Sequence, residues 1–303
     1  MATHAGPIVV GADGGLTDSS AVRWAAVLAQ RTGLPLIVVH ASEPEALAAR
    51  AAVAGATDIT LLLEAEEEGN QQLSEQVDAM GNNLGIDVTY VTRRGSAGKA
   101  LLEYQHEASV IVVGTGRKGL ISEFVLGTTS LAVAAHAHCP VAVINPEVKV
   151  EALTHHRIGV GIDGSRDSQA AATAALQFAE TVDAGVVAVS TWYIETVDGY
   201  LVTEPDSPEW HQLQESKRST LERALAPARE AHPQVPVELE VRRGPVIGTL
   251  LEMSKDWDLV VVGSRGLGGI QGRLLGSVSQ RLMRAASVPV LVCTLPKDVA
   301  VDA

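Results

Sequence analysis

Aromatic residues are scarce in this chain of 303 residues: there are ten, or 3%. Aliphatic residues must therefore build the core, which suits parallel sheets flanked by helices better than an aromatic-rich β-sandwich. Cysteine is scarcer still, and Cys139 and Cys293 alone cannot form a disulfide framework. The chain also has no apolar run near the length that a membrane-spanning helix needs. We therefore expect no membrane segment.

Basic charge is in deficit, since 23 Lys and Arg stand against 36 Asp and Glu, a formal net charge of −13. Nucleic-acid binding normally rests on basic patches, so the balance argues against a nucleic-acid partner. An anionic ligand would have to be held by local backbone donors. Residues 1–6 contain no apolar run of the kind that a signal peptide has, so we expect a cytoplasmic protein.

What the chain does have is a repeat the length of a domain. Ile8–Gly14 is similar to Ile158–Gly164, 150 residues later, and Val112–Gly114 is similar to Val261–Gly263, 149 residues later. Such matches, in order along the chain, indicate two copies of one domain. We predict domains at residues 1–147 and 155–303, joined by a polar linker that follows Pro146.

Short β-branched runs alternate with helical patterns in each copy, as in βαβ units. The fold class is therefore α/β, with two tandem doubly wound domains, each a five-stranded parallel sheet with helices on both faces. The strands are expected at 8–10, 36–40, 88–92, 110–113 and 141–144, and at 157–160, 186–190, 237–241, 259–262 and 290–293.

Glycine and small polar residues follow the first and fourth strands of each copy, where an open α/β sheet binds its ligands. Gly114 and Gly263 each open a loop that reaches, thirteen residues later, Gly127 or Gly276 at the start of an apolar helix. Glycine lets the backbone approach an anion, and a helix N-terminus adds unpaired N–H donors. Each piece alone could be an ordinary turn or N-cap. Both pieces in both copies favour a phosphate site.

Other side chains near these loops have alternative roles. Asp13 and Asp163 could cap a turn or accept hydrogen bonds from a ribose or an adenine amine. Ala41 and Thr191 follow the second strand, where a small residue leaves room for a base. Arg117, Lys118 and Arg265 could add positive charge or simply be solvated.

Residues 114–119 match the GxGxxG dinucleotide fingerprint. However, the match follows the fourth strand instead of the first, and no acidic residue stands about twenty positions on. A nicotinamide-dependent enzyme is therefore the third hypothesis, behind the two given below.

Gly263-Ser264-Arg265-Gly266, nine further residues and Gly276-Ser277 resemble the G-2x-G-9x-G-[ST] signature of ATP-binding universal stress proteins. The resemblance covers Val9–Asn145 and Ile158–Cys293. It implies the strand order 3-2-1-4-5 and an ATP site, with or without Mg²⁺, at the carboxyl ends of strands 1 and 4. The residues that would bind ATP in the first copy are Gly11, Asp13, Ala41, Gly114, Arg117, Gly127, Thr128, Thr129 and Ser130. Those in the second copy are Gly161, Asp163, Thr191, Gly263, Arg265, Gly266, Gly276, Ser277, Val278 and Ser279.

The first copy departs from the signature because Arg117 stands where the second has Gly266. That side chain could crowd the phosphates or contact one directly. The resemblance also implies pairing of the two copies through their last strands, near Pro140 and Pro289, or a homodimer formed in the same way.

Catalysis finds little support in the sequence. The nine histidines are scattered, and His136, His138 and Cys139 lack the remaining ligands of a zinc site, so we expect no metal site and no enzyme activity beyond slow ATP hydrolysis. The leading hypothesis is an ATP-binding universal stress protein that acts as a nucleotide-dependent stress-response switch towards regulatory partners. The alternative is a protein-interaction scaffold of the same fold with no nucleotide function.

Overall fold

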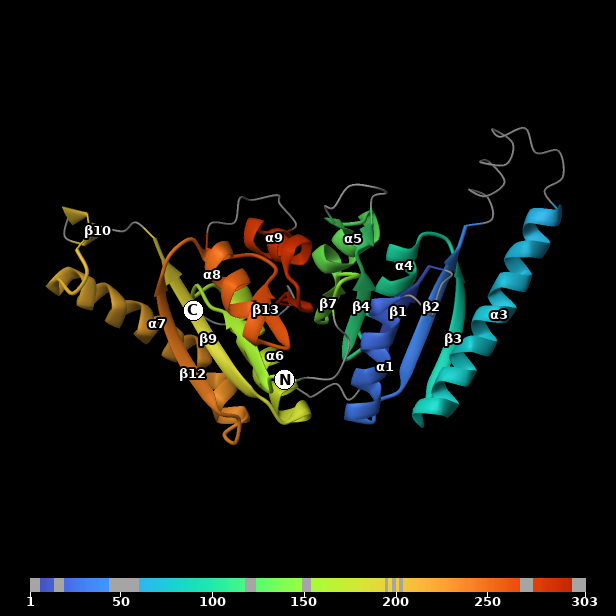
Figure 1. Ribbon diagram of the computed structural model, residues 1–303, viewed down its shortest axis with the longest axis horizontal. Helices are drawn as coiled ribbons and strands as arrows, with labels where there is room; N and C mark the ends of the chain where they lie inside the picture. The colour runs from blue at the N-terminus through green and yellow to red at the C-terminus, as the bar shows by residue number, and fades with distance from the viewer. Residues whose placement is uncertain are drawn as a thin grey trace, which may run out of the picture. The chain divides into compact units, whose positions relative to one another are not determined.

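The computed structural model describes residues 6–13, 19–43, 60–117, 124–148, 154–193, 196–197, 200–201, 204–267 and 275–295. They form two compact units. The described residues up to Gly116, together with Gly127–Pro146, make the first unit. The described residues of Arg117–Leu126 and those from Glu147 onward make the second. Figure 1 labels the helices and strands of both units.

The first unit contains a five-stranded parallel sheet with the order β3-β2-β1-β4-β7. Its main strands are β1 (Ile8–Ala12), β2 (Leu36–Ser42), β3 (Val88–Arg94), β4 (Val110–Gly114) and β7 (Val141–Ile144). Its helices are α1 (Ser20–Thr32), α3 (Thr60–Leu84), α4 (Ala97–Leu102) and α5 (Thr128–His136). Two short strands, β5 (Gly116–Arg117) and β6 (Phe124–Val125), pair with each other between β4 and α5.

The second unit repeats this order as β12-β9-β8-β13-β14. Its main strands are β8 (Arg157–Gly161), β9 (Gly185–Trp192), β12 (Val237–Arg243), β13 (Leu259–Gly263) and β14 (Val290–Cys293). Its helices are α6 (Arg166–Val182), α7 (Pro208–Ala231), α8 (Val246–Met253) and α9 (Ser277–Ala285), with a 3₁₀ turn at Ser254–Asp256. A small hairpin joins β10 (Thr196–Val197) and β11 (Tyr200–Leu201). The expected fold class and strand order are therefore confirmed in both units.

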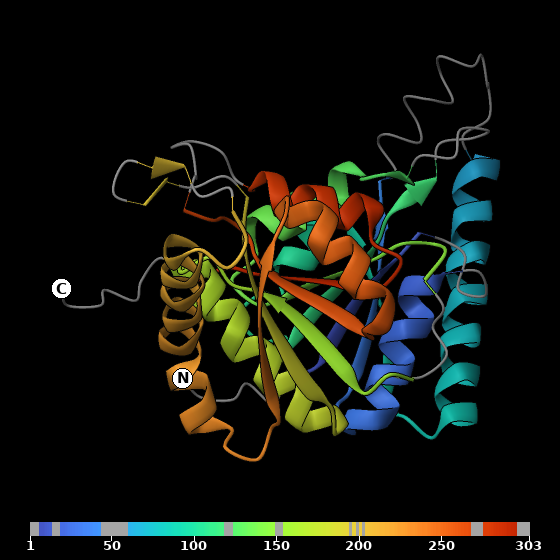
Figure 2. The ribbon, with the colours of Figure 1, turned by 60° about the vertical axis from the view of Figure 1, so that its left-hand side comes forward.

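Aliphatic strands and small helix residues account for the core. Strand β13, an inner strand of the second unit, begins with a run of leucine and valine that is buried on both faces, as parallel strands are. Helix α6 presents Ala171, Ala175 and Ala179, spaced four residues apart and fully buried, to the sheet. This small-residue stripe brings α6 close to β13 and β8. Helices α6 and α7 pack together, as do α8 and α9 (Figure 2).

The local start and stop signals of the helices also work as the sequence predicts. Ser19 caps α1 by accepting a hydrogen bond from the N–H of Val22 (3.3 Å), and Gly33 ends it at a positive φ of 68°.

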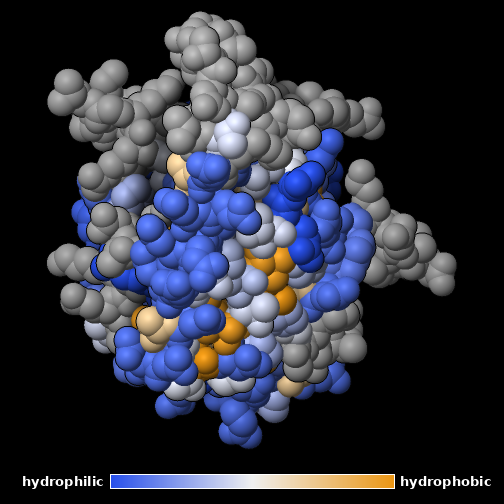
Figure 3. Space-filling model, turned by 90° about the vertical axis from the view of Figure 1, so that its right-hand side faces the viewer, coloured by the Kyte–Doolittle hydropathy of each residue, from blue (hydrophilic) through white to orange (hydrophobic). Residues whose placement is uncertain are grey.

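The acidic run Glu64–Glu68 lies on α3 and is largely exposed, except that Glu66 accepts a hydrogen bond from the Ser42 hydroxyl. The molecular surface on this side is mainly hydrophilic, with small separate apolar spots (Figure 3).

None of the described helices is both long and apolar enough to cross a bilayer. The expected pairing of the last strands, β7 and β14, concerns the placement of one unit against the other. It stays a prediction, as does the homodimer.

Candidate nucleotide site

The cleft of the second unit lies at the carboxyl ends of β8 and β13, the two strands whose further neighbours lie on opposite sides. Its volume is about 410 Å³, the size of a small-molecule pocket. All ten residues expected to bind ligand in this copy line it: Gly161, Asp163, Thr191, Gly263, Arg265, Gly266, Gly276, Ser277, Val278 and Ser279. Leu250 and Val246 of α8 add an apolar wall.

Two glycines let the loop after β13 close onto its neighbours. A Cβ at Gly266 would lie 2.4 Å from Oδ2 of Asp163, and one at Gly263 would lie 2.7 Å from the carbonyl carbon of Asp167. A side chain at Gly263 would therefore force the loop away from the backbone of α6, whereas one at Gly266 would displace the Asp163 carboxylate. The protein's own packing therefore disfavours a side chain at both positions.

Asp163 joins the two loops of the cleft. Its Oδ1 accepts a hydrogen bond from the N–H of Ser165 (2.9 Å) and its Oδ2 accepts one from the N–H of Leu267 (3.0 Å). Desolvation by the surrounding protein would raise the pKa of the carboxyl, but the hydrogen bonds from Ser165, Leu267 and Ser168 outweigh it and lower the pKa. The carboxylate is thus charged at neutral pH and exposed to the cleft, so it can still accept a hydrogen bond from a ligand hydroxyl or amine.

Two of the groups expected to bind phosphate form hydrogen bonds within the protein instead. The N–H of Gly276 donates to the carbonyl oxygen of Ser264 (2.7 Å), and the Ser279 hydroxyl lies 3.1 Å from the same oxygen. Ser279 is 1% exposed. These two groups therefore fix the start of α9 against the loop after β13.

The open donors of the cradle are the first amides of α9. The first intrahelical bond runs from the N–H of Gln280 to the carbonyl oxygen of Gly276 (3.1 Å), so the amides of Ser277 and Val278 precede the helical ladder. Both residues line the cleft. With the Ser277 hydroxyl, they form the anion-binding end of the helix dipole.

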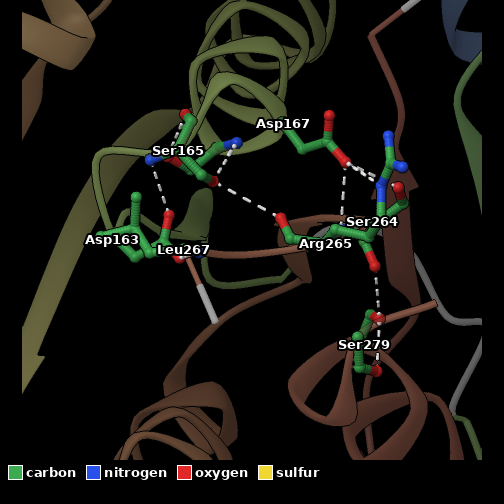
Figure 4. A network of polar contacts seen from close by, with 9 residues as sticks. Asp163, Ser165, Asp167, Ser264, Arg265, Leu267 and Ser279 are labelled. Carbon is green, nitrogen blue, oxygen red and sulfur yellow. Dashed lines mark hydrogen bonds and ion pairs between the residues drawn. The ribbon is translucent and has the colours of Figure 1, made fainter. Parts of the chain in front are cut away.

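A buried carboxylate that the sequence reasoning missed supports the loop after β13. Asp167, in the first turn of α6, is 6% exposed. Its Oδ2 accepts hydrogen bonds from the Ser264 hydroxyl (2.8 Å), the Arg265 N–H (3.1 Å) and Arg265 Nε (3.2 Å), as Figure 4 shows. An acidic residue just inside a helix usually serves the helix dipole, so only its partners on a distant loop reveal this role.

An aromatic cluster lies beyond Thr191, which lines the cleft together with Val189 of the same strand, β9. The rings of Trp192 and Trp210 meet edge to face with centroids 4.6 Å apart. The Arg243 guanidinium lies 5.5 Å from the first ring centroid and 5.2 Å from the second, at cation–π distance. Trp192 is 2% exposed, and its indole Nε1 has no hydrogen-bond partner among the described residues.

The first unit has a cleft at the equivalent place, at the carboxyl ends of β1 and β4, with a volume of about 460 Å³. Seven of the nine expected residues line it: Gly11, Asp13, Ala41, Gly114, Gly127, Thr129 and Ser130. Thr128 begins α5 and is not among the lining residues. The side chain of Arg117 lies outside the described residues.

The two clefts differ in what supports the loop after the fourth strand. Ala21 occupies the place of Asp167, because a Cβ at Gly114 would meet the Ala21 Cβ at 3.6 Å. Gly116 stands where the second unit has Arg265. Thr115, the counterpart of Ser264, donates instead to Oδ1 of Asn145 (2.8 Å).

Three other features of the sequence were candidates for a site: possible metal ligands, the cysteines and the GxGxxG match. None of them forms an assembled site in the part of the chain that the structure describes. That part holds no group of three or more His, Cys, Asp or Glu side chains placed to bind a metal ion. Burial raises the pKa of the Cys139 thiol to about 12, so this cysteine is not a thiolate at neutral pH. Residues 114–117 of the GxGxxG match follow β4, while Gly119 lies outside the described residues.

Comparisons with known proteins agree with this architecture. The model of the universal stress protein family matches residues 5–145 and again residues 154–294. A universal stress protein from Mycolicibacterium smegmatis is 33% identical over 94% of this chain and 96% of its own length. The crystal structure of a universal stress protein from Archaeoglobus fulgidus covers 98% of this chain and 100% of its own, with 16% identity and a TM-score of 0.67, which bears on the fold alone. A universal stress protein solved in complex with cAMP covers 45% of this chain, with a TM-score of 0.37 and 26% identity.

Proposed function

Because the chain belongs to the universal stress protein family, we propose that it binds ATP at the carboxyl ends of its sheets and acts as a nucleotide-dependent regulatory switch in the cytoplasm. The main support is the cleft of the second unit, on which all ten expected residues converge. Its apolar wall suits a nucleoside, and the open amides at the start of α9 suit phosphates.

The geometry favours binding over turnover. A hydrolytic site needs a base that can activate water, whereas Asp167 is buried and the lowered pKa of Asp163 makes its carboxylate a weak base. The proposed activity is therefore a change of state on binding ATP, with at most slow hydrolysis. A net charge of −13 opposes the approach of ATP, so binding of its phosphates must rely on local backbone amides.

Isothermal titration calorimetry of the full chain with ATP, with and without Mg²⁺, tests the proposal. We expect saturable binding that Gly276→Glu removes from the second cleft, because the new side chain brings bulk and negative charge to the first turn of α9. The matched variant Gly127→Glu alters the same position of the first cleft. Absence of binding at millimolar ATP would refute the proposal and leave the protein-interaction scaffold as the explanation.

A further inference from the structure

The pair formed by Asp167 and Arg265 divides the arginine side chain into a bound part and an open part. Oδ2 of Asp167 accepts a hydrogen bond from Nε of Arg265 (3.2 Å) and another from the backbone N–H of Arg265 (3.1 Å). A guanidinium carries five N–H donors, of which this contact uses one. Among the described residues, no hydrogen bond involves the two terminal nitrogens, Nη1 and Nη2. The side chain is 42% exposed, and Arg265 lines the cleft.

Because Asp167 is buried, its carboxylate depends on the groups that donate hydrogen bonds to it. A carboxylate taken out of water is costly unless charges and hydrogen bonds compensate it, and here a hydroxyl, an amide and a guanidinium all meet one oxygen. The arginine is therefore held in one orientation before a ligand arrives. Figure 4 shows Nε turned towards Asp167 and the rest of the guanidinium extending beyond it.

The arginine also lies next to the phosphate cradle. A Cβ at Gly276 would come within 3.4 Å of the Arg265 Cα, so the loop residue and the start of α9 are in close contact. An arginine whose terminal amino groups are open can bind a phosphate through two parallel hydrogen bonds. The amides of α9 and the terminal nitrogens of Arg265 would thus grip different parts of a phosphate chain.

The first unit lacks both members of the pair. Ala21 and Gly116 occupy the two positions, so the pair has no counterpart there, while the side chain of the neighbouring Arg117 lies outside the described residues. The loop after β4 is held instead through Thr115 and Asn145, which are uncharged. Among the described residues, the two clefts therefore differ in charge at these two positions.

We propose that Asp167 is a positioning residue that holds Arg265 as a clamp for the outer phosphates, so that the second cleft selects nucleoside triphosphates over monophosphates. This inference rests on the proposed nucleotide binding and adds the specificity of one cleft to it.

The test compares the affinities for ATP, ADP and AMP by calorimetry. It uses the full chain carrying Gly127→Glu, so that the second cleft is measured alone. Replacing both partners, Asp167→Ala with Arg265→Ala, avoids leaving a buried charge unpaired. We expect this variant to lose about tenfold or more in affinity for ATP, as for a charge-assisted hydrogen bond, while its affinity for AMP changes less than about twofold. A loss of packing alone would weaken both ligands equally.

Two further variants separate positioning from charge. Asp167→Asn should lower the preference for ATP over AMP in the same direction, and it should have no further effect when Arg265 is already alanine. The control Glu240→Ala with Arg242→Ala removes an ion pair of 3.0 Å that is outside the cleft lining, and should leave the preference unchanged. An unchanged preference in the Asp167 and Arg265 variants, or tighter ATP binding, overturns the inference while nucleotide binding stands. Absence of any nucleotide binding by the unmodified protein refutes the proposed function as well.

Discussion

A single glycine makes room for a buried tryptophan in the second unit. A Cβ at Gly159 of β8 would lie 2.0 Å from the Trp257 ring, which is 2% exposed. The corresponding positions of the first unit hold Val9 and Ala108, both buried. The second unit thus has the small residue at the first position and the large one at the second. The first unit has the larger residue at the first position and the smaller at the second, as close packing of the same space requires.

We predict that Gly159→Ala destabilises the protein by about 3 kcal/mol, because a buried indole in a packed core cannot move aside without strain. Urea unfolding followed by circular dichroism measures the change. Gly69→Ala is the matched control, since a Cβ there meets nothing within 4 Å, and alanine in a helix should be neutral or stabilising by up to about 1 kcal/mol. A loss below about 0.5 kcal/mol in Gly159→Ala would contradict the packing argument.

The roles of single residues were the hardest feature to predict from the sequence. Asp163 could be assigned to the cleft because it follows a strand at a known edge of the sheet. Asp167 could not, because its partners, Ser264 and Arg265, lie about 97 positions further along the chain and only the fold brings them together. Likewise, the sequence gives no sign that the Ser279 hydroxyl would be used inside the protein.

Helices and strands follow the sequence closely except at their ends. The run expected at 237–241 is longer in the structure, where Arg242 and Arg243 still pair with Thr191 and Trp192. The apolar pattern stops where the strand leaves the core, whereas backbone pairing needs no apolar side chain. The elements and their order could therefore be predicted, while the ends of the strands that border the cleft could not.

The serine N-caps of α6 and α7 allow a stability effect to be separated from an effect on the cleft. Ser165 and Ser207 each accept a hydrogen bond at 3.2 Å from the amide three residues on. We predict that Ser165→Ala and Ser207→Ala each cost about 1 kcal/mol of stability in denaturant unfolding.

Only Ser165→Ala should also weaken ATP binding, by severalfold, because the Ser165 hydroxyl contacts the carbonyl oxygen of Arg265 at 3.4 Å. Neither serine lines the cleft, so an effect of Ser165 on ATP binding would act through the loop after β13. Equal ATP affinities in the two variants would show that the N-cap of α6 does not order the loop after β13.

At the scale of the whole chain, one carboxylate fastens the segment that leads into the second unit. Asp258 accepts hydrogen bonds from the backbone N–H groups of Thr154 (2.7 Å), His155 (3.0 Å) and Arg157 (3.2 Å). The polar linker predicted after Pro146 therefore ends as an ordered turn against the start of β13.

We predict that Asp258→Ala raises the hydrogen-exchange rates of these three amides by about tenfold or more, since each loses a charged acceptor. Asp256→Ala removes the same charge two residues away and serves as the control. Mass spectrometry of peptides covering residues 154–157 gives the readout. Unchanged exchange in Asp258→Ala would mean that other contacts hold this segment.

Duplication of the domain was readable from the sequence because glycine and small polar residues recur at fixed spacing. The division of roles between the copies was not, since Ala21 and Gly116 are unremarkable residues until their counterparts are seen to touch. A repeat therefore predicts two similar clefts, and only the contacts within each unit show that the clefts differ.

The aromatic cluster beside the second cleft places a fluorescent side chain next to a residue that lines this cleft. Trp192 directly follows Thr191 of the cleft and meets Trp210 and Arg243, whereas the first unit has Ser42 at the corresponding position. The emission of an indole depends on nearby charge and on the polarity around its ring. In a chain carrying Trp24→Phe, which removes the tryptophan of the first unit, a change in intrinsic fluorescence during a titration would therefore report loading of the second cleft. The difference between that signal and the total heat of binding would report loading of the first.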